Sequence, residues 1–219
     1  MTLLAIMAAA VVPLASLTVH STTTDASNAD ALCQWYAEGA CLVKERPVEA
    51  RKLLGTPPES MDFLKSFVKA ATGTNCFQNE VEGTAPKMHP NATRGAVVEA
   101  LFAADFSAIG QARGTLYAKI FDLDAPYEAT GADLGQIRAR AFLKLGECVA
   151  SRQPTDTVSV FRTRVASGEE SAAVRLLTSS ISECMPPDLT LKIVPSMFRS
   201  YLVEGAYRVS IAQLGRAGS

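Results

Sequence analysis

Apolar side chains recur every three or four residues along most of the chain, which is the pattern of helices that bury one face. Met61, Leu64 and Val68 form one such run. Two longer runs, from about Thr93 and from about Ser196, are apolar over most of a helical circumference, so we expect both helices to be buried. The pattern therefore predicts an all-α fold.

Two short motifs predict where helices begin. Thr56 is followed by two prolines and by Glu59, which is the spacing of an N-cap, a first helical turn and a capping-box acid. We therefore expect a helix to begin at Thr56. Ser167 and Glu170 repeat this cap chemistry in the second half of the chain, at a different distance from the neighbouring cysteines. We therefore do not assign the two caps to equivalent positions.

The two halves of the chain repeat one order of residue types. An aromatic residue, a glycine, a cysteine and a proline recur at an offset of 107 residues, as Trp35, Gly39, Cys41 and Pro47 and then as Phe142, Gly146, Cys148 and Pro154. Arg94 and Glu99 recur as Arg199 and Glu204 at an offset of 105. This ordered agreement predicts a tandem duplication of a small helical unit. Because there are only two copies, we expect one pseudo-twofold domain rather than an extended array.

The repeat and the local composition divide the chain into four parts. We assign residues 1–29 to a signal peptide and polar spacer, 30–109 to the first helical repeat, 110–137 to a connector and 138–219 to the second repeat. Within the connector, the apolar stretch Leu116–Leu123 fits a helix or a strand equally well. The acids of the connector do not follow the ligand spacing of an EF-hand, and we interpret them as solvated: Asp122, Asp124, Glu128 and Asp133.

The N-terminus has the pattern of a secretory signal. No charged side chain occurs in residues 2–19, and an apolar run over residues 3–12 is closed by Pro13. A polar spacer follows, and we expect cleavage after Ala26 or Ala29. The expected location is periplasmic or secreted, with no integral membrane segment after cleavage. An uncleaved membrane anchor is the alternative, because the apolar stretch approaches the length that spans a bilayer.

The cysteines predict a covalent framework. Each copy holds two cysteines about 35 residues apart, and an exported protein meets an oxidising compartment. We predict the disulfides Cys41–Cys76 and Cys148–Cys184, with Cys33 as an unpaired thiol. Two alternatives remain at this point: Cys33 forms an intermolecular bridge in a dimer, or Cys33 pairs with Cys76 and leaves Cys41 free.

Composition and charge narrow the function classes. The 219 residues are 48% hydrophobic, which is enough for a buried core, and 21 basic residues balance 22 acidic ones. Such a balance gives no general attraction to nucleic acid. The chain holds two histidines, His20 and His89, so zinc sites rich in histidine and most histidine-dependent triads are poorly supported. The sequence predicts no metal and no cofactor.

One polar pair recurs in both copies and is the main candidate for chemistry. The members of each pair, Arg94 with Glu99 and Arg199 with Glu204, are five residues apart. Side chains contact along a helix at spacings of three or four, so we expect each residue to have its partner on another element. Because apolar residues flank both carboxylates, we expect both to be at least partly buried and to have a structural role. The alternative makes Glu99 and Glu204 the acid and base of a glycoside-cleaving hydrolase.

The function expected from these observations is that of an exported, non-catalytic binding or interaction module. Its partner is an unidentified protein or small molecule, and not nucleic acid. Arg138, Arg140 and Lys144 are expected to form one basic helix face, which is either solvated or a dock for an anionic partner. The hydrolase and a membrane-tethered scaffold are the alternatives.

Overall fold

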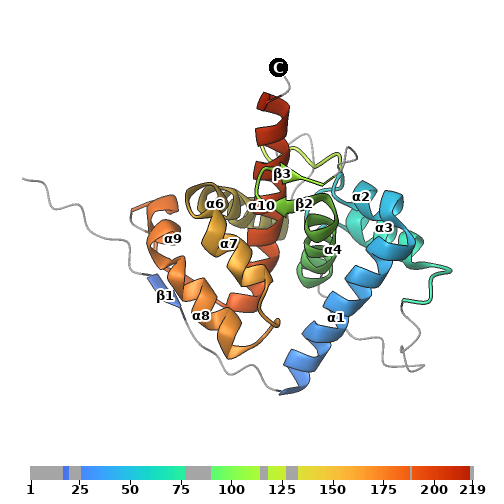
Figure 1. Ribbon diagram of the computed structural model, residues 1–219, viewed down its shortest axis with the longest axis horizontal. Coiled ribbons are helices and arrows are strands. Elements are labelled where there is room, and N and C mark those ends of the chain that lie inside the picture. The colour runs from blue at the N-terminus through green and yellow to red at the C-terminus, as the bar shows by residue number, and fades with distance from the viewer. Residues whose placement is uncertain are drawn as a thin grey trace, which may run out of the picture.

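The computed structural model describes residues 17–19, 26–76, 90–113, 118–126, 133–187 and 189–217. One long helix, α10 (Pro195–Ala217), runs through the middle of the fold (Figure 1). It packs along α4 (Pro90–Asp105) on one side and along α6 (Leu134–Arg152) on the other, and α4 in turn packs on α1 (Ala26–Glu45). The all-α prediction is confirmed, and so is the burial of the helices expected near Thr93 and Ser196.

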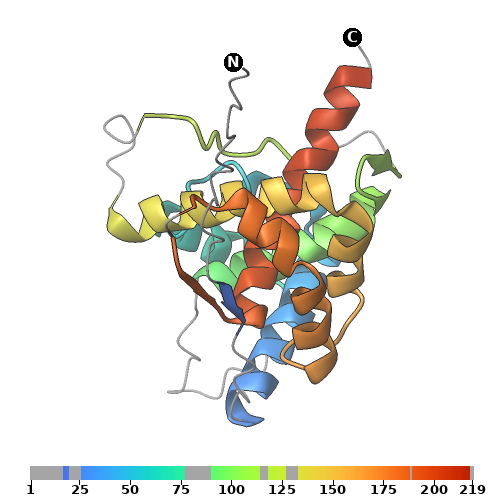
Figure 2. The ribbon, with the colours of Figure 1, turned by 90° about the vertical axis from the view of Figure 1, so that its left-hand side faces the viewer.

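Shorter helices cover the two sides of this arrangement. One side carries α2 (Pro47–Leu53) and α3 (Met61–Ala71), and the other carries α7 (Pro154–Phe161), α8 (Gly168–Leu176) and α9 (Thr178–Cys184) (Figure 1). Both α2 and α7 begin at a proline, whose fixed φ and missing N–H suit the first helical position. Figure 2 shows the C-terminal end of α10 extending beyond the other helices.

Two small pairs of strands join the helices. Strand β1 (Leu17–Val19) pairs in parallel with β4 (Leu191–Ile193), directly before α10. Strands β2 (Phe106–Ala108) and β3 (Gln111–Ala112) form an antiparallel hairpin after α4. Gly110 turns this hairpin with a φ of 74°, and its N–H donates to Ser210 Oγ on α10.

Glycines allow the long helices to cross closely. A Cβ on Gly39 of α1 would lie 2.8 Å from the backbone of Ala96 on α4. A Cβ on Gly146 of α6 would overlap the carbonyl oxygen of Tyr201 on α10. Both glycines belong to the repeated sequence pattern, and both lie where one backbone meets another.

The apolar core follows these crossings. The largest cluster combines α1 to α4 with the C-terminal half of α10, and Phe63, Leu101 and Tyr207 are nearly inaccessible to solvent within it. A second cluster joins α6 to α9 with the start of α10, where Ile181 and Leu202 are fully buried. The C-terminal helix therefore contributes to both clusters and links the two halves.

The structure corrects the helix start expected at Thr56. Helix α3 begins at Met61, and the side chain of Ser60 is its N-cap, accepting a hydrogen bond from the Phe63 N–H at 3.0 Å. Two consecutive prolines disfavour helical backbone in the residue before each, and Glu59 takes a positive φ of 53°. The cap predicted at Ser167 is confirmed, since its side chain accepts from the Glu170 N–H at 3.1 Å.

Both predicted disulfides are present, Cys41–Cys76 and Cys148–Cys184. Cys33 is unpaired and partly buried, and its sulfur lies 3.9 Å from the carbonyl oxygen of Val165. The alternative pairing of Cys33 with Cys76 is therefore wrong. An intermolecular bridge through Cys33 stays a prediction.

The segments predicted to flank the repeats are described in part. The apolar run at residues 3–12, both histidines, and residues 114–117 and 127–132 of the connector lie outside the described residues. In the rest of Leu116–Leu123, residues 118–123 form neither helix nor strand. Helix α1 begins at Ala26, within the expected spacer, and α6 begins at Leu134, within the expected connector. Among the helices described, none is both long enough and apolar enough to cross a membrane.

Candidate functional site

The repeated arginines and glutamates pair across the two halves. Arg94 on α4 donates from Nε to Glu204 Oε2 at 2.6 Å and from NH2 to Glu204 Oε1 at 2.8 Å. Its NH1 donates to the carbonyl oxygens of Leu53 and Thr56, where α2 ends. Both charged side chains are almost fully buried. The bidentate pair therefore fixes α10 against the first half of the chain.

The second arginine makes the reciprocal contact. Arg199 on α10 donates from Nε and NH2 to the two carboxylate oxygens of Glu99, each at 2.7 Å. It also donates to the carbonyl oxygens of Phe161 and Thr163, where α7 ends. Each arginine thus binds the end of a short helix in its own half and a glutamate in the other half.

The two pairs differ in their additional charged neighbours. Glu204 also accepts from Arg208 at 2.9 Å, so two guanidinium groups surround this carboxylate. Burial alone would raise the pKa of Glu204, but the charges and hydrogen bonds of Arg94 and Arg208 outweigh it and lower the pKa to about 2. Glu204 is therefore held as a carboxylate at neutral pH.

Around Arg199 the ratio of charges is reversed. Its NH1 also donates to Glu170 at 3.2 Å, so one guanidinium group serves two carboxylates, Glu170 and Glu99. Burial raises the pKa of Glu99 and of Glu170, and the positive charge of Arg199 offsets part of this effect. The prediction that Glu99 and Glu204 are at least partly buried is confirmed: Glu204 is buried, and Glu99 is half-buried with 19% of its side chain exposed.

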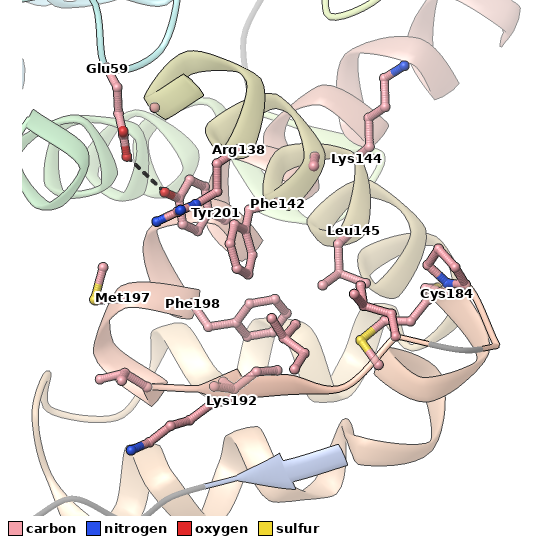
Figure 3. A pocket seen from close by; sticks show the side chains of 18 residues that line it. Glu59, Arg138, Phe142, Lys144, Leu145, Cys184, Lys192, Met197, Phe198 and Tyr201 are labelled. Atoms are coloured by element: carbon pink, nitrogen blue, oxygen red, sulfur yellow. Dashed lines mark hydrogen bonds between the residues drawn. The ribbon is translucent and has the colours of Figure 1, made fainter. Parts of the chain in front are cut away.

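A pocket of about 880 Å³ opens on the second half of the molecule, between α6, β4 and the start of α10 (Figure 3). One face of α6 supplies Arg138, Phe142 and Leu145, which stand three or four residues apart. The segment that follows α9 and the start of α10 supply the opposite wall, including Met185, Leu189, Leu191, Ile193, Val194, Met197, Phe198 and Tyr201. The pocket is therefore lined mainly by apolar and aromatic side chains, as ligand pockets are.

The disulfide and an aromatic pair support the walls of this pocket. Cys184 lies in the lining, and its bond to Cys148 ties the end of α9 to α6. Phe142 and Tyr201 stack with their ring centroids 5.0 Å apart, which joins α6 to α10. Both walls are thus held by contacts between elements and not by one loop alone.

Polar contact at one end of the pocket comes from the first half of the chain. The Tyr201 hydroxyl donates to a carboxylate oxygen of Glu59 at 2.9 Å, as Figure 3 shows. Burial, and then the neighbouring charge of Glu59, raise the pKa of Tyr201, so its hydroxyl remains protonated at neutral pH. Glu59 is the residue with positive φ ahead of α3, and this backbone turn brings its carboxylate to the pocket.

Three basic side chains border the pocket: Arg138, Lys144 and Lys192. Lys144 pairs with Asp124 at 2.5 Å, and both side chains are exposed. Arg138 and Lys192 are exposed, and neither has an ion-pair partner in the part of the chain that the structure describes. The expected basic face is wrong in one member, because Arg140 is fully buried, donates to the Ala125 carbonyl and lies over the Phe121 ring.

The sequence analysis did not find the pocket. Its lining combines one helix face with a turn, a short strand and the start of another helix, and no local spacing connects these segments. Phe142, an aromatic residue of the repeated sequence pattern, was the one available signal, but Trp35, which matches it in the first half of the chain, is not in the lining.

The described residues offer one cluster of side chains of the types that bind metals, namely Cys41, Glu45 and Cys76. Both sulfurs are joined in a disulfide, which removes the thiolates that a metal would need. This cluster is therefore part of the covalent framework.

Comparisons with known proteins give no relative from which a function could be inferred, so the inference rests on the geometry of the pocket. No protein-family model, no curated protein and no solved structure matches the chain.

Proposed function

We propose that the protein is an exported, non-catalytic binding module whose ligand occupies the pocket between α6, β4 and α10. The observation that carries this proposal is a volume of about 880 Å³ with a mainly apolar lining. Cavities of this size and composition bind small molecules or the apolar parts of larger ones. The aromatic stack of Phe142 and Tyr201 and the Cys148–Cys184 bond hold the walls in place.

The buried carboxylates favour binding over hydrolysis. A glycoside-cleaving site needs one carboxyl group that gives up a proton and another that accepts one, both facing the substrate. Here Glu204 is held ionised by Arg94 and Arg208, and both oxygens of Glu99 accept hydrogen bonds from Arg199. Neither residue lines the pocket. These contacts support structural roles for both pairs.

We further infer that the binding module arose by tandem duplication and forms one pseudo-twofold domain. The support lies in matched contacts: Arg94 binds the carbonyls of Leu54 and Thr56, and Arg199 binds those of Phe161 and Thr163, which stand 107 residues later. The positive φ of Glu59 and the cap of Ser60 recur at the same offset as Ala166 and Ser167. Gly39 and Gly146 contact equivalent helices at equivalent points.

Export is part of the proposal. Two disulfides are consistent with an oxidising compartment outside the cytoplasm. The charge-free N-terminal stretch supplies the expected signal. A membrane-tethered scaffold is the competing proposal, and it requires residues 3–12 to remain on the mature protein. The N-terminal sequence and cell fraction of the protein from its natural host distinguish the two.

A fluorescence titration tests the binding site. The uncharged fluorophore N-phenylnaphthylamine emits more strongly in apolar surroundings, and we expect saturable binding to the purified protein. Ala141 lines the pocket from an exposed position on α6, so Ala141→Trp fills space without disturbing the core. The matched control is Ala103→Trp, at an exposed position of α4 outside the pocket.

We expect Ala141→Trp to weaken fluorophore binding at least tenfold and Ala103→Trp to leave it unchanged. Equal binding by both variants would place the fluorophore elsewhere and overturn the assignment of the pocket. No saturable binding by the unmodified protein would also overturn it. Far-ultraviolet circular dichroism of each variant establishes that the comparison is made between folded proteins.

A further inference from the structure

We propose that the ligand is an amphiphile with one apolar chain and an anionic headgroup, and that Arg138 and Lys192 bind this headgroup. The inference rests on the proposed function, because it names the ligand class of the same pocket. It is carried by the position of the charged side chains around an otherwise apolar lining.

The two cations lie on the same side of the pocket. Figure 3 shows the charged ends of Arg138, from α6, and Lys192, from β4, toward the left of the view, above and below Met197. Within the described ranges, neither cation forms an ion pair. Each of these two side chains can form an ion pair with an anionic group at the border of the pocket.

The other charged side chains of the described lining, Lys144 and Glu59, already have partners. Lys144 lies on the other side of the view from Arg138 and is paired with Asp124. Glu59 is the one acid among the lining residues that the structure describes, and its carboxylate accepts the hydroxyl hydrogen of Tyr201. Among the described lining residues, two cations without an ion pair therefore stand against one hydrogen-bonded carboxylate.

The apolar part of the ligand has a continuous path inward. Phe198 and Ile193 are nearly fully buried and form the deeper wall, while Leu189 and Met197 are each 46% exposed at the rim. Covering these half-exposed side chains removes apolar surface from water, which favours a ligand with an alkyl chain over a fully polar one. The lining and the charges therefore point to one ligand class.

Competition against the bound fluorophore tests the headgroup. The probes share one chain length and are used below the concentrations at which they aggregate: dodecanoate, dodecanol and dodecyltrimethylammonium. Acetate supplies the carboxylate without the chain. We expect dodecanoate to displace the fluorophore most effectively, dodecyltrimethylammonium least, and acetate not at all.

Charge-neutral variants test the residues. In the double variant Arg138→Gln/Lys192→Gln, we expect about a five- to tenfold loss of dodecanoate affinity and no change for dodecanol, since partly exposed ion pairs are worth about 1 kcal/mol. The control is Lys65→Gln/Lys69→Gln, which removes the same charge from exposed positions of α3.

The possible results separate this inference from the proposed function. If dodecanoate and dodecyltrimethylammonium compete equally, or if both double variants behave alike, the headgroup assignment is wrong although the pocket still binds the fluorophore. If acetate alone displaces the fluorophore, the site recognises a free anion and the amphiphile is wrong. If the fluorophore does not bind at all, the proposed function fails first.

Discussion

Replacing Glu204 by glutamine separates the electrostatic role of this residue from its shape. Glutamine keeps the volume of the side chain and removes its charge. Arg94 and Arg208 then remain buried without the carboxylate that both contact. Removing one member of a buried ion pair destabilises a protein by about 3–5 kcal/mol, because the remaining charge is left in a medium of low polarity.

The pKa gives a second measure of the same effect. A fall from the ordinary value of 4.5 to about 2 corresponds to about 3 kcal/mol of folding free energy, since one pKa unit is worth about 1.4 kcal/mol. The two measures agree, and we expect Glu204→Gln to lower the free energy of unfolding by about 3 kcal/mol at pH 7. Urea titrations followed by circular dichroism measure this quantity.

The loss should depend on pH in a defined direction. The pKa of Glu204 is lower in the folded protein than in the unfolded chain, so its contribution is fully present above about pH 4.5 and is lost as the pH falls toward about 2. The difference between the wild type and Glu204→Gln should therefore shrink as the pH falls through this range. A difference that stays constant from pH 7 to pH 2 would refute the electrostatic explanation.

Glu99→Gln is the matched control, because Glu99 occupies the corresponding place in the reciprocal pair. Burial raises the pKa of Glu99, so folding favours its neutral form more than the unfolded chain does, and its contribution is lost as the pH rises through the raised pKa. Arg199 also keeps Glu170 as a partner. We expect Glu99→Gln to destabilise the protein less than Glu204→Gln at pH 7, and its effect to become more favourable as the pH rises. An equal loss in both variants would show that the two pairs are not distinguished by their charged neighbours.

Two further predictions concern the helix crossings and the disulfides. Gly146→Ala places a Cβ against the Tyr201 carbonyl and should lower the free energy of unfolding by about 1–3 kcal/mol. In the control Gly215→Ala, a Cβ meets nothing within 4 Å, and the free energy of unfolding should rise by up to about 1 kcal/mol. Equal thermal midpoints for the two variants would contradict the close crossing of α6 and α10. Replacing both Cys148 and Cys184 by serine opens a loop with a sequence separation of 36 and should lower the free energy of unfolding by about 4 kcal/mol, with Cys33→Ser as the neutral control. A loss below 1 kcal/mol in urea titration would contradict this estimate.

The sequence predicted those features of the fold that depend on one short segment of the chain. The cap at Ser167 follows from neighbouring residues alone, and the structure contains it. The Thr56 motif has similar residues, but consecutive prolines and the positive φ of Glu59 move the helix start to Met61. Cysteine spacing within each half of the chain was sufficient for both disulfides, because the partners of each bond lie about 35 residues apart in one half.

The partners of the buried charges could be predicted only in part. A spacing of five on a helix indicated that Arg94 and Glu99 do not pair with each other, but it did not identify Glu204 as the partner of Arg94. That choice depends on how α4 and α10 cross. Arg140 shows the same limit, because the turn of the chain at Ala125 draws it inward from a face predicted to be basic.

The pocket lay beyond sequence reasoning for a related reason. Its apolar members look like core residues, and Phe142 and Phe198 also belong to the packing of α6 and α10. Only the arrangement of β4 and the start of α10 leaves space next to them.

The reciprocal pairs also have a consequence for the order in which the chain is completed. Synthesis proceeds from the N-terminus, so Arg94 leaves the ribosome more than a hundred residues ahead of Glu204. Glu204 and Arg199 both lie on α10. Until α10 has emerged, Arg94 therefore lacks its carboxylate partner and Glu99 lacks its arginine. We therefore expect neither half to reach its final packing during translation. A chain that stays open until α10 is made agrees with the proposed export, in which the chain crosses a membrane before it folds.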